Sequence, residues 1–188
     1  MNSTISDAYK KLKLPVKESY ETLKANIRLY DFGTKNIKTL TITSCRAGEG
    51  KTTTACNLAV SMVKSGLKVL IVDADLHKPE LMKELKGDNN LGLSNVLLGY
   101  AELNEAINFT SIENLHYISC GVTPINPAVL LGSAEFKELM ATVCDQYDMV
   151  IFDTPPLASV IDSMIVASQT DGTILVIQPG KLFPGYYF

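Results

Sequence analysis

Apolar residues along this chain form short runs that alternate with stretches of helical spacing. The runs predict strands at residues 38–44, 68–75, 114–121, 148–156 and 172–178. Those at 68–75 and 148–156 are apolar through most of their length, which is typical of strands buried on both faces of a parallel sheet.

Between the strands, apolar residues recur at the three- and four-residue spacing of amphipathic helices. This spacing predicts helices at residues 16–30, 51–66, 92–99, 102–109, 133–147 and 162–168. Strands that alternate with helices are joined by right-handed crossovers, so we expect an α/β fold with a doubly wound, mostly parallel sheet. Ligands of such folds lie beyond the carboxyl ends of the strands.

The length of 188 residues suits one domain with one sizeable core. Within it we expect an N-terminal arm with an amphipathic helix over residues 1–37, an α/β body over residues 38–178 and a short tail over residues 179–188. The apolar stripe of the first helix would consist of Tyr20, Leu23, Ile27 and Tyr30.

The net charge of −3 speaks against a dedicated nucleic-acid binder, but the charge is unevenly distributed. Residues 1–38 hold eight Lys and Arg against four Asp and Glu, and the remaining residues hold nine against sixteen. Two interpretations of the basic arm stay open: a solvated surface, or a contact with an anionic partner or membrane.

No apolar run approaches the roughly 20 residues of a membrane-spanning helix, and the N-terminus lacks the apolar core of a signal peptide. We therefore expect a cytoplasmic protein. The four cysteines are widely spaced, which favours reduced thiols over a zinc or redox site. His77 and His116 also lack the spacing of metal ligands.

The stretch SCRAGEGKTTT at residues 44–54 lies between a predicted strand and a predicted helix. It matches the phosphate-binding loop, which is Gly, four residues and then Gly-Lys-Ser/Thr, except that Cys45 occupies the first glycine position. In such a loop Gly48 and Gly50 let backbone N–H groups face phosphate, and the helix N-terminus adds its positive dipole. The alternative is a glycine turn with a purely structural role.

The side chains at the end of this loop suit a nucleotide with a metal ion. Lys51 would contact the β- and γ-phosphates of ATP, and the Thr52 hydroxyl would ligate Mg²⁺. Glu49 and Thr53 fall within the stretch in which we expect the close phosphate contacts.

Aspartates follow two of the predicted strands. Asp153 ends one apolar run, as a Mg²⁺-orienting carboxylate does in P-loop enzymes. Asp73 and Asp75 end another, and their spacing on extended backbone would direct both carboxylates the same way. Each alone is compatible with a turn or a helix cap. Together with the glycine loop they predict a site that holds a metal and accepts a proton.

The segments TSCRAGEGKTTTACNLA, VLIVDADLHKPEL, GLSNVLLG and YDMVIFDTPPLASVIDSMIVA closely resemble the bacterial tyrosine kinases of capsule and exopolysaccharide synthesis, of the CpsD/CapB type, within the MinD/ParA-like P-loop ATPases. The likeness extends from about residue 18 to residue 178. It implies an ATP–Mg²⁺ kinase that phosphorylates tyrosines in its own C-terminal tail, usually on a neighbouring subunit of a ring. A P-loop kinase domain over residues 38–178 and a subunit contact through the N-terminal arm are implied as well.

The resemblance also implies partners and residue roles. The kinase would lie at the inner face of the membrane, activated by the cytosolic tail of a membrane-anchored regulator of polysaccharide chain length. Lys51 and Thr52 would bind phosphate and metal, Asp75 and Asp153 would support Mg²⁺, and Asp73 would accept the proton.

This sequence departs from the family at three places. Glu21 and Lys24, after Glu18, stand where the family's subunit motif has two arginines, and His77 replaces an arginine after the second aspartate. The chain ends at residue 188, so we expect a C-terminally shortened member in which Tyr186 and Tyr187 are the candidate phosphoacceptors, either a remnant of the tyrosine tail or a chance pair. The alternatives are a MinD/ParA-like ATPase switch and a truncated, non-catalytic interaction module.

Overall fold

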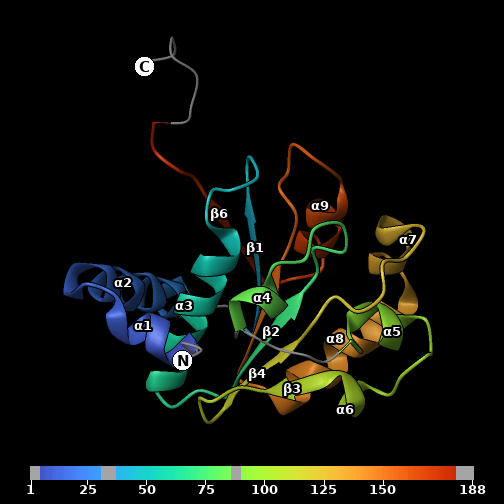
Figure 1. Ribbon diagram of the computed structural model, residues 1–188, viewed down its shortest axis with the longest axis horizontal. Coiled ribbons are helices and arrows are strands. Elements are labelled where there is room, and N and C mark those ends of the chain that lie inside the picture. The colour runs from blue at the N-terminus through green and yellow to red at the C-terminus, as the bar shows by residue number, and fades with distance from the viewer. Residues whose placement is uncertain (1–4, 31–36, 86–89, 181–188) are drawn as a thin grey trace.

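A computed structural model describes residues 5–30, 37–85 and 90–180 of the chain (Figure 1). Its centre is a six-stranded sheet with the strand order β3-β4-β2-β5-β1-β6. The strands are β1 (Thr39–Ser44), β2 (Val69–Asp73), β3 (Ile107–Phe109), β4 (Leu115–Ile118), β5 (Met149–Asp153) and β6 (Gly172–Val176). All pairs are parallel except β3 with β4. The predicted doubly wound, mostly parallel α/β fold is confirmed.

Helices cover both faces of the sheet (Figure 1). They are α1 (Ile5–Lys11), α2 (Leu14–Tyr30), α3 (Lys51–Lys64), α4 (Leu81–Leu85), α5 (Leu93–Leu97), α6 (Leu103–Ala106), α7 (Pro127–Leu131), α8 (Ala134–Gln146) and α9 (Asp162–Ala167). Helices α1 to α4 enclose one apolar cluster, which includes Ile42, Leu58 and Ile71. Helices α5 to α9 enclose the other, which includes Phe136 and Phe152. The central strands β1, β2 and β5 are buried along their whole length.

One predicted helix is partly wrong. The stretch 102–109 is helical only in α6, and its last residues form the edge strand β3. Asn108 pairs with Tyr117 of β4 in antiparallel register. The edge of the sheet offers unpaired backbone groups, and pairing with them overrides the local helical spacing.

The two N-terminal helices pack against α3 of the same chain. Tyr20, Leu23 and Ile27 contact the first apolar cluster, as the predicted stripe requires. The Lys24 amine lies 2.5 Å from Glu21 Oε2 and donates to the Ser61 carbonyl of α3 at 3.3 Å. Ser61 Oγ donates to Glu21 Oε1 at 2.6 Å. Residues that depart from the family's subunit motif therefore hold α2 to its own body, and contact with a second subunit stays a prediction.

Residues 181–188 lie outside the described part of the chain, and with them Tyr186 and Tyr187. The last described strand, β6, pairs with β1 on one side and is half exposed. Within residues 5–30, 37–85 and 90–180, no helix combines the length and the apolar character needed to cross a bilayer.

Candidate active site

The phosphate loop connects β1 to α3, and two glycines give it its conformation. Gly48 and Gly50 have φ angles of 77° and 91°, in the left-handed region that side chains disfavour. A Cβ added at either position would meet nothing within 4 Å, so backbone conformation and not space requires glycine. Gly50 is the N-cap of α3 and Lys51 its first residue. The free N–H groups of the first helical turn therefore lie beside the loop.

The missing first glycine has a simple structural explanation. Among the described residues, Asn114 is the one non-glycine residue with a positive φ. Cys45 therefore does not have a positive φ, and its backbone conformation does not require glycine. The Cys45 carbonyl accepts a hydrogen bond from Ala158 N at 3.2 Å. Within the loop, Glu49 Oε2 accepts from Arg46 N at 2.8 Å. The Glu49 side chain thus braces the loop, whereas Thr53 is exposed.

Thr52 and Asp153 meet at the base of the loop. Thr52 Oγ1 donates to Asp153 Oδ2 at 2.5 Å, and both residues are buried. Asp153 Oδ1 is also buried and has no hydrogen-bond partner among the described residues. An unpartnered buried carboxylate oxygen is costly, and Mg²⁺ takes carboxylate and hydroxyl oxygens as ligands. This pair therefore fits the predicted metal.

Strand register brings the predicted aspartates together. Because β2 and β5 are adjacent and parallel, Asp73 lies directly opposite Asp153. Asp73 is fully buried, and its oxygens accept from Asp75 N and Leu81 N, both at 3.2 Å. β2 ends at Asp73, two residues earlier than predicted, so Asp75 lies in the following turn, where Oδ1 accepts from Lys78 N at 2.9 Å. Asp75 lines the pocket described next, whereas Asp73 does not.

A pocket of about 210 Å³ opens over the loop. Its lining includes Gly48, Lys51 and Asp75, together with Pro155, Pro156, Ser159 and Val160. His77 Nε2 lies 3.0 Å from Asp162 Oδ2 at the rim, and Asp162 is 2% exposed. This pair ties the turn after β2 to α9. Sequence reasoning missed it, because the only local signal was the position of Asp162 at a predicted helix start.

Burial changes the acidity of both strand-end aspartates. It raises the pKa of Asp153 to about 7, although the Thr52 hydrogen bond and the Lys51 charge lower it in part. Burial and then the neighbouring Asp153 charge raise the pKa of Asp73 well above its usual range. A divalent cation beside these groups would favour the ionised carboxylates. The raised pKa values of the two carboxyls therefore fit a site that takes a cation.

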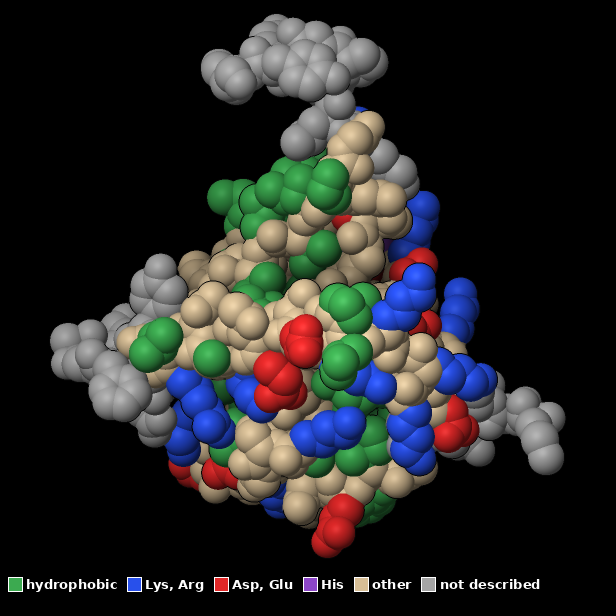
Figure 2. Space-filling view, turned by 90° about the vertical axis from the view of Figure 1, so that its left-hand side faces the viewer, with side chains coloured by type: hydrophobic (Ala, Val, Ile, Leu, Met, Phe, Trp, Pro, Cys, Tyr) green, Lys and Arg blue, Asp and Glu red, His purple; other side chains and the backbone are tan. Residues whose placement is uncertain are grey.

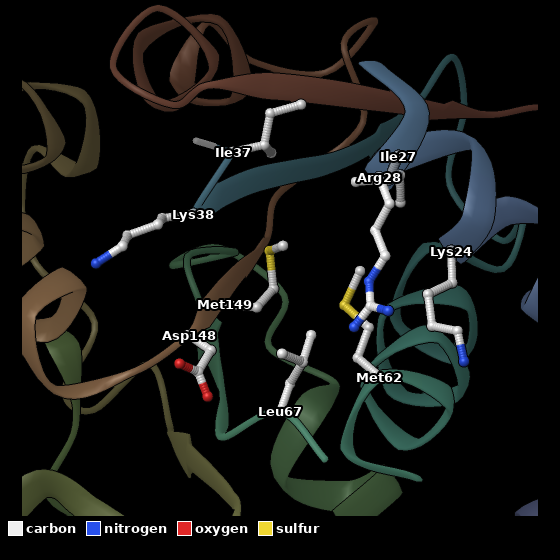
Figure 3. A pocket seen from close by; sticks show the side chains of 9 residues that line it. All are labelled: Lys24, Ile27, Arg28, Ile37, Lys38, Met62, Leu67, Asp148 and Met149. Carbon is white, nitrogen blue, oxygen red and sulfur yellow. The ribbon is translucent and has the colours of Figure 1, made fainter. Parts of the chain in front are cut away.

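A second cavity of about 220 Å³ lies at the other end of the sheet, before the first residues of β1 and β5 (Figure 3). Apolar side chains, including Ile27, Met62 and Leu67, share its wall with charged ones. The charged groups already have partners: Lys38 Nζ donates to the Cys144 carbonyl at 3.0 Å, and an Arg28 guanidinium nitrogen lies 3.4 Å from Ser65 Oγ. None of the predicted phosphate or metal residues lines this cavity, so it is not part of the candidate active site.

Comparison with known proteins agrees with this geometry. A family model described as an AAA domain matches residues 37–183. The tyrosine-protein kinase YwqD of Bacillus subtilis (strain 168) is 43% identical over 164 residues, which cover 87% of this chain and 69% of the relative. The crystal structure of the chimerical protein CapA2B2 is similar with a TM-score of 0.84 at 34% identity, over 89% of this chain and 73% of that one.

A more distant likeness is to the septum site-determining protein MinD of Pyrococcus horikoshii OT3, solved as a complex with Mg-ADP. Its TM-score is 0.63 at 31% identity, over 74% of this chain and 57% of that one. The likeness to kinases is thus closer in sequence and in structure than the likeness to MinD. This chain belongs to the bacterial tyrosine-protein kinases of the CpsD and CapB type, a group within the P-loop ATPases that share the MinD fold.

Proposed function

We propose that this chain is an ATP- and Mg²⁺-dependent protein-tyrosine autokinase that regulates capsular or exopolysaccharide synthesis. The observation that carries the proposal is the Thr52–Asp153 pair, with its unpartnered carboxylate oxygen, directly beneath a glycine loop that begins a helix. Membership in the tyrosine-kinase family supports the same conclusion. The P-loop kinase domain would span residues 38–178.

We assign one role to each of the predicted site residues. The backbone of residues 48–53 and the Lys51 ammonium would bind the ATP phosphates and orient them. Thr52, Asp75 and Asp153 would hold Mg²⁺, which when bound neutralises the developing phosphate charge. Asp73 would accept the proton of the tyrosine hydroxyl, because a carboxylate whose pKa is raised is the stronger base once ionised.

The partners follow from the same proposal. The kinase would assemble with further copies of itself and receive the cytosolic tail of a membrane-anchored polysaccharide chain-length regulator, which would keep it at the inner face of the membrane. Tyr186 and Tyr187 are the proposed acceptors in this chain. The similarity to the chimerical protein CapA2B2 supports a membrane partner.

The test is incubation of the purified chain with radiolabelled ATP, Mg²⁺ and the tail of its membrane partner, followed by detection of phosphotyrosine. We expect labelling that Lys51→Met, Asp75→Asn and Tyr186→Phe/Tyr187→Phe each abolish or strongly reduce. Lys137→Met, at an exposed position of α8, is the matched control and should retain labelling. Absence of phosphotyrosine in a folded, ATP-binding protein would refute the kinase proposal.

The likeness to MinD supports a second candidate, an ATPase switch. This candidate predicts ATP hydrolysis without phosphotyrosine, whereas a non-catalytic interaction module predicts that ATP–Mg²⁺ does not bind. Calorimetry with ATP–Mg²⁺ followed by phosphate-release measurements separates the three functions.

A further inference from the structure

The end of α1, the turn after it and the start of α2 carry several lysines and no acidic residue. We call residues 10–17, with the sequence KKLKLPVK, the lysine corner; it holds four lysines and no acidic residue. Lys10, Lys11 and Lys13 are exposed. Figure 2 shows the side of the molecule that carries α1 and α2, where Lys and Arg side chains are numerous and Asp and Glu side chains lie among them.

Apolar side chains are exposed within the same stretch. Leu14 is 68% exposed and Val16 is 39% exposed. Farther along the same helix Tyr20, Leu23 and Ile27 pack against the core, and Leu29 is exposed as well. Single exposed apolar residues are common. Leu14 and Val16, however, lie between lysines. Basic and apolar side chains together match the headgroup and acyl layers of a bilayer surface, so this combination indicates a membrane contact.

The lysine corner is held firmly against the body. Ile5 and Tyr9 of α1 are buried, and the Lys64 amine of α3 lies 4.2 Å from the centre of the Tyr9 ring. Lys17 Nζ donates to the Lys10 carbonyl at 2.8 Å, which ties α2 to α1. A surface that is already ordered loses little conformational entropy when it binds.

We propose that the lysine corner rests directly on an anionic bilayer, with Lys10, Lys11 and Lys13 among the lipid headgroups and Leu14 and Val16 toward the acyl chains. An acidic protein surface would also attract the lysines, but a bilayer presents anionic headgroups and an apolar layer together along the whole contact. The described residues that line the phosphate pocket lie outside the lysine corner, so such a contact leaves the pocket open. The proposal rests on charge and exposure and is independent of the kinase reaction.

The acidic residues of the same helices reduce this attraction without cancelling it. They are Asp7, Glu18 and Glu21, against six Lys and Arg in residues 5–30. Glu21 is already paired with Lys24. Each basic residue close to an anionic membrane strengthens binding by roughly fivefold, so three exposed lysines give on the order of 100-fold.

Co-sedimentation of the full chain with vesicles, without ATP or a partner protein, tests the proposal. We expect binding to phosphatidylcholine vesicles that contain about one third phosphatidylglycerol, weak binding to pure phosphatidylcholine, and a strong decrease between about 0.1 M and about 0.5 M salt. Lys11→Gln/Lys13→Gln should lower the affinity roughly 20-fold. The matched variant Lys83→Gln/Lys137→Gln removes the same charge from exposed positions outside the corner and should retain the affinity within about threefold.

Leu14→Ser separates a lipid surface from an acidic macromolecule, because it leaves the charge unchanged. We expect it to weaken vesicle binding severalfold and to leave binding to soluble polyglutamate unchanged. Thermal melts confirm that each variant is folded. Any of three results would overturn the proposal. The wild-type chain could bind anionic vesicles no more strongly than neutral ones, the two double lysine variants could lose the same vesicle affinity, or Leu14→Ser could bind vesicles as the wild type does.

Discussion

Asp153 has two carboxylate oxygens in different situations. One accepts the Thr52 hydroxyl, and the other is buried without a partner among the described residues. The first contact fixes the side chain, and the second leaves a negative group whose natural complement is a cation. The charge of Asp153 therefore affects both the stability of the fold and the binding of a cation at the site.

The raised pKa of Asp153 predicts how stability depends on pH. Its folded pKa is about 7, above the ordinary value of 3.8. Between these values the folded state binds more protons than the unfolded state, so this group's contribution to stability falls as the pH rises from about 4 to 7. Asp153→Asn removes the free-energy cost of ionising this buried carboxyl. In the absence of Mg²⁺ we expect it to raise the free energy of unfolding by roughly 2–4 kcal/mol at pH 8 and by little at pH 4.

Urea titrations of both proteins at the two pH values, in the presence of a chelator, give this difference directly. The Asp153→Asn variant should also lose most of the Mg²⁺-dependent part of ATP binding. A variant that is less stable than wild type at pH 8 would contradict the assigned charge state of Asp153.

At the scale of single elements, α5 is joined to the end of β4 by a backbone contact that only glycine allows. A Cβ on Gly92 would lie 2.2 Å from the Ser119 carbonyl oxygen and 2.3 Å from Gly121 N. Leu93 N donates to the same Ser119 carbonyl at 2.7 Å. The close approach fixes the start of α5 against the chain that follows β4.

Gly92→Ala should therefore destabilise the protein by more than about 3 kcal/mol, because backbone atoms must separate. Gly99→Ala is the comparison: Gly99 has a φ of 72° but nothing within 4 Å of its added Cβ, so the cost should be only the conformational strain of about 1–2 kcal/mol. Denaturant unfolding of the two variants measures both costs. Similar values for the pair would argue against the close backbone contact.

The attachment of α2 to α3 gives a second prediction at this scale. Lys24→Ala removes the ion pair with Glu21, the hydrogen bond to the Ser61 carbonyl and the buried aliphatic stem. We expect a loss of about 1–2 kcal/mol in the free energy of unfolding. Asn26→Ala, at an exposed position of the same helix, should have almost no effect. If the two changes cost the same, Lys24 does not secure α2.

For the molecule as a whole, the strand order predicts an uneven stability. β2 and β5 are flanked by strands on both sides and fully buried, whereas β6 is a half-exposed edge strand. Amide hydrogen exchange should be slowest at residues 69–73 and 149–153 and at least about tenfold faster at residues 172–176. Mass spectrometry of peptic fragments resolves these segments. Equal protection of β6 would mean that its free edge is covered in solution.

Features that depend on neighbouring residues could be predicted without the structure. The buried strands, the amphipathic helix before them and the phosphate loop all follow from periodicity and from the glycine-lysine-threonine spacing, which act over a few residues. The same local rules explain why Asp73 and Asp153 were correctly predicted at strand ends, whereas Asp75 lies in the turn after β2.

Contacts between distant segments could not be predicted in this way and became visible in the three-dimensional packing. The strand order sets Asp73 opposite Asp153, the free edge beside β4 turns Ile107–Phe109 into a strand, and packing joins His77 to Asp162. No local pattern encodes these pairings, because strand register and edge pairing are chosen by burial of the whole sheet. The candidate active site therefore combines a phosphate loop, which is a local motif, with aspartates that are brought together by strand pairing.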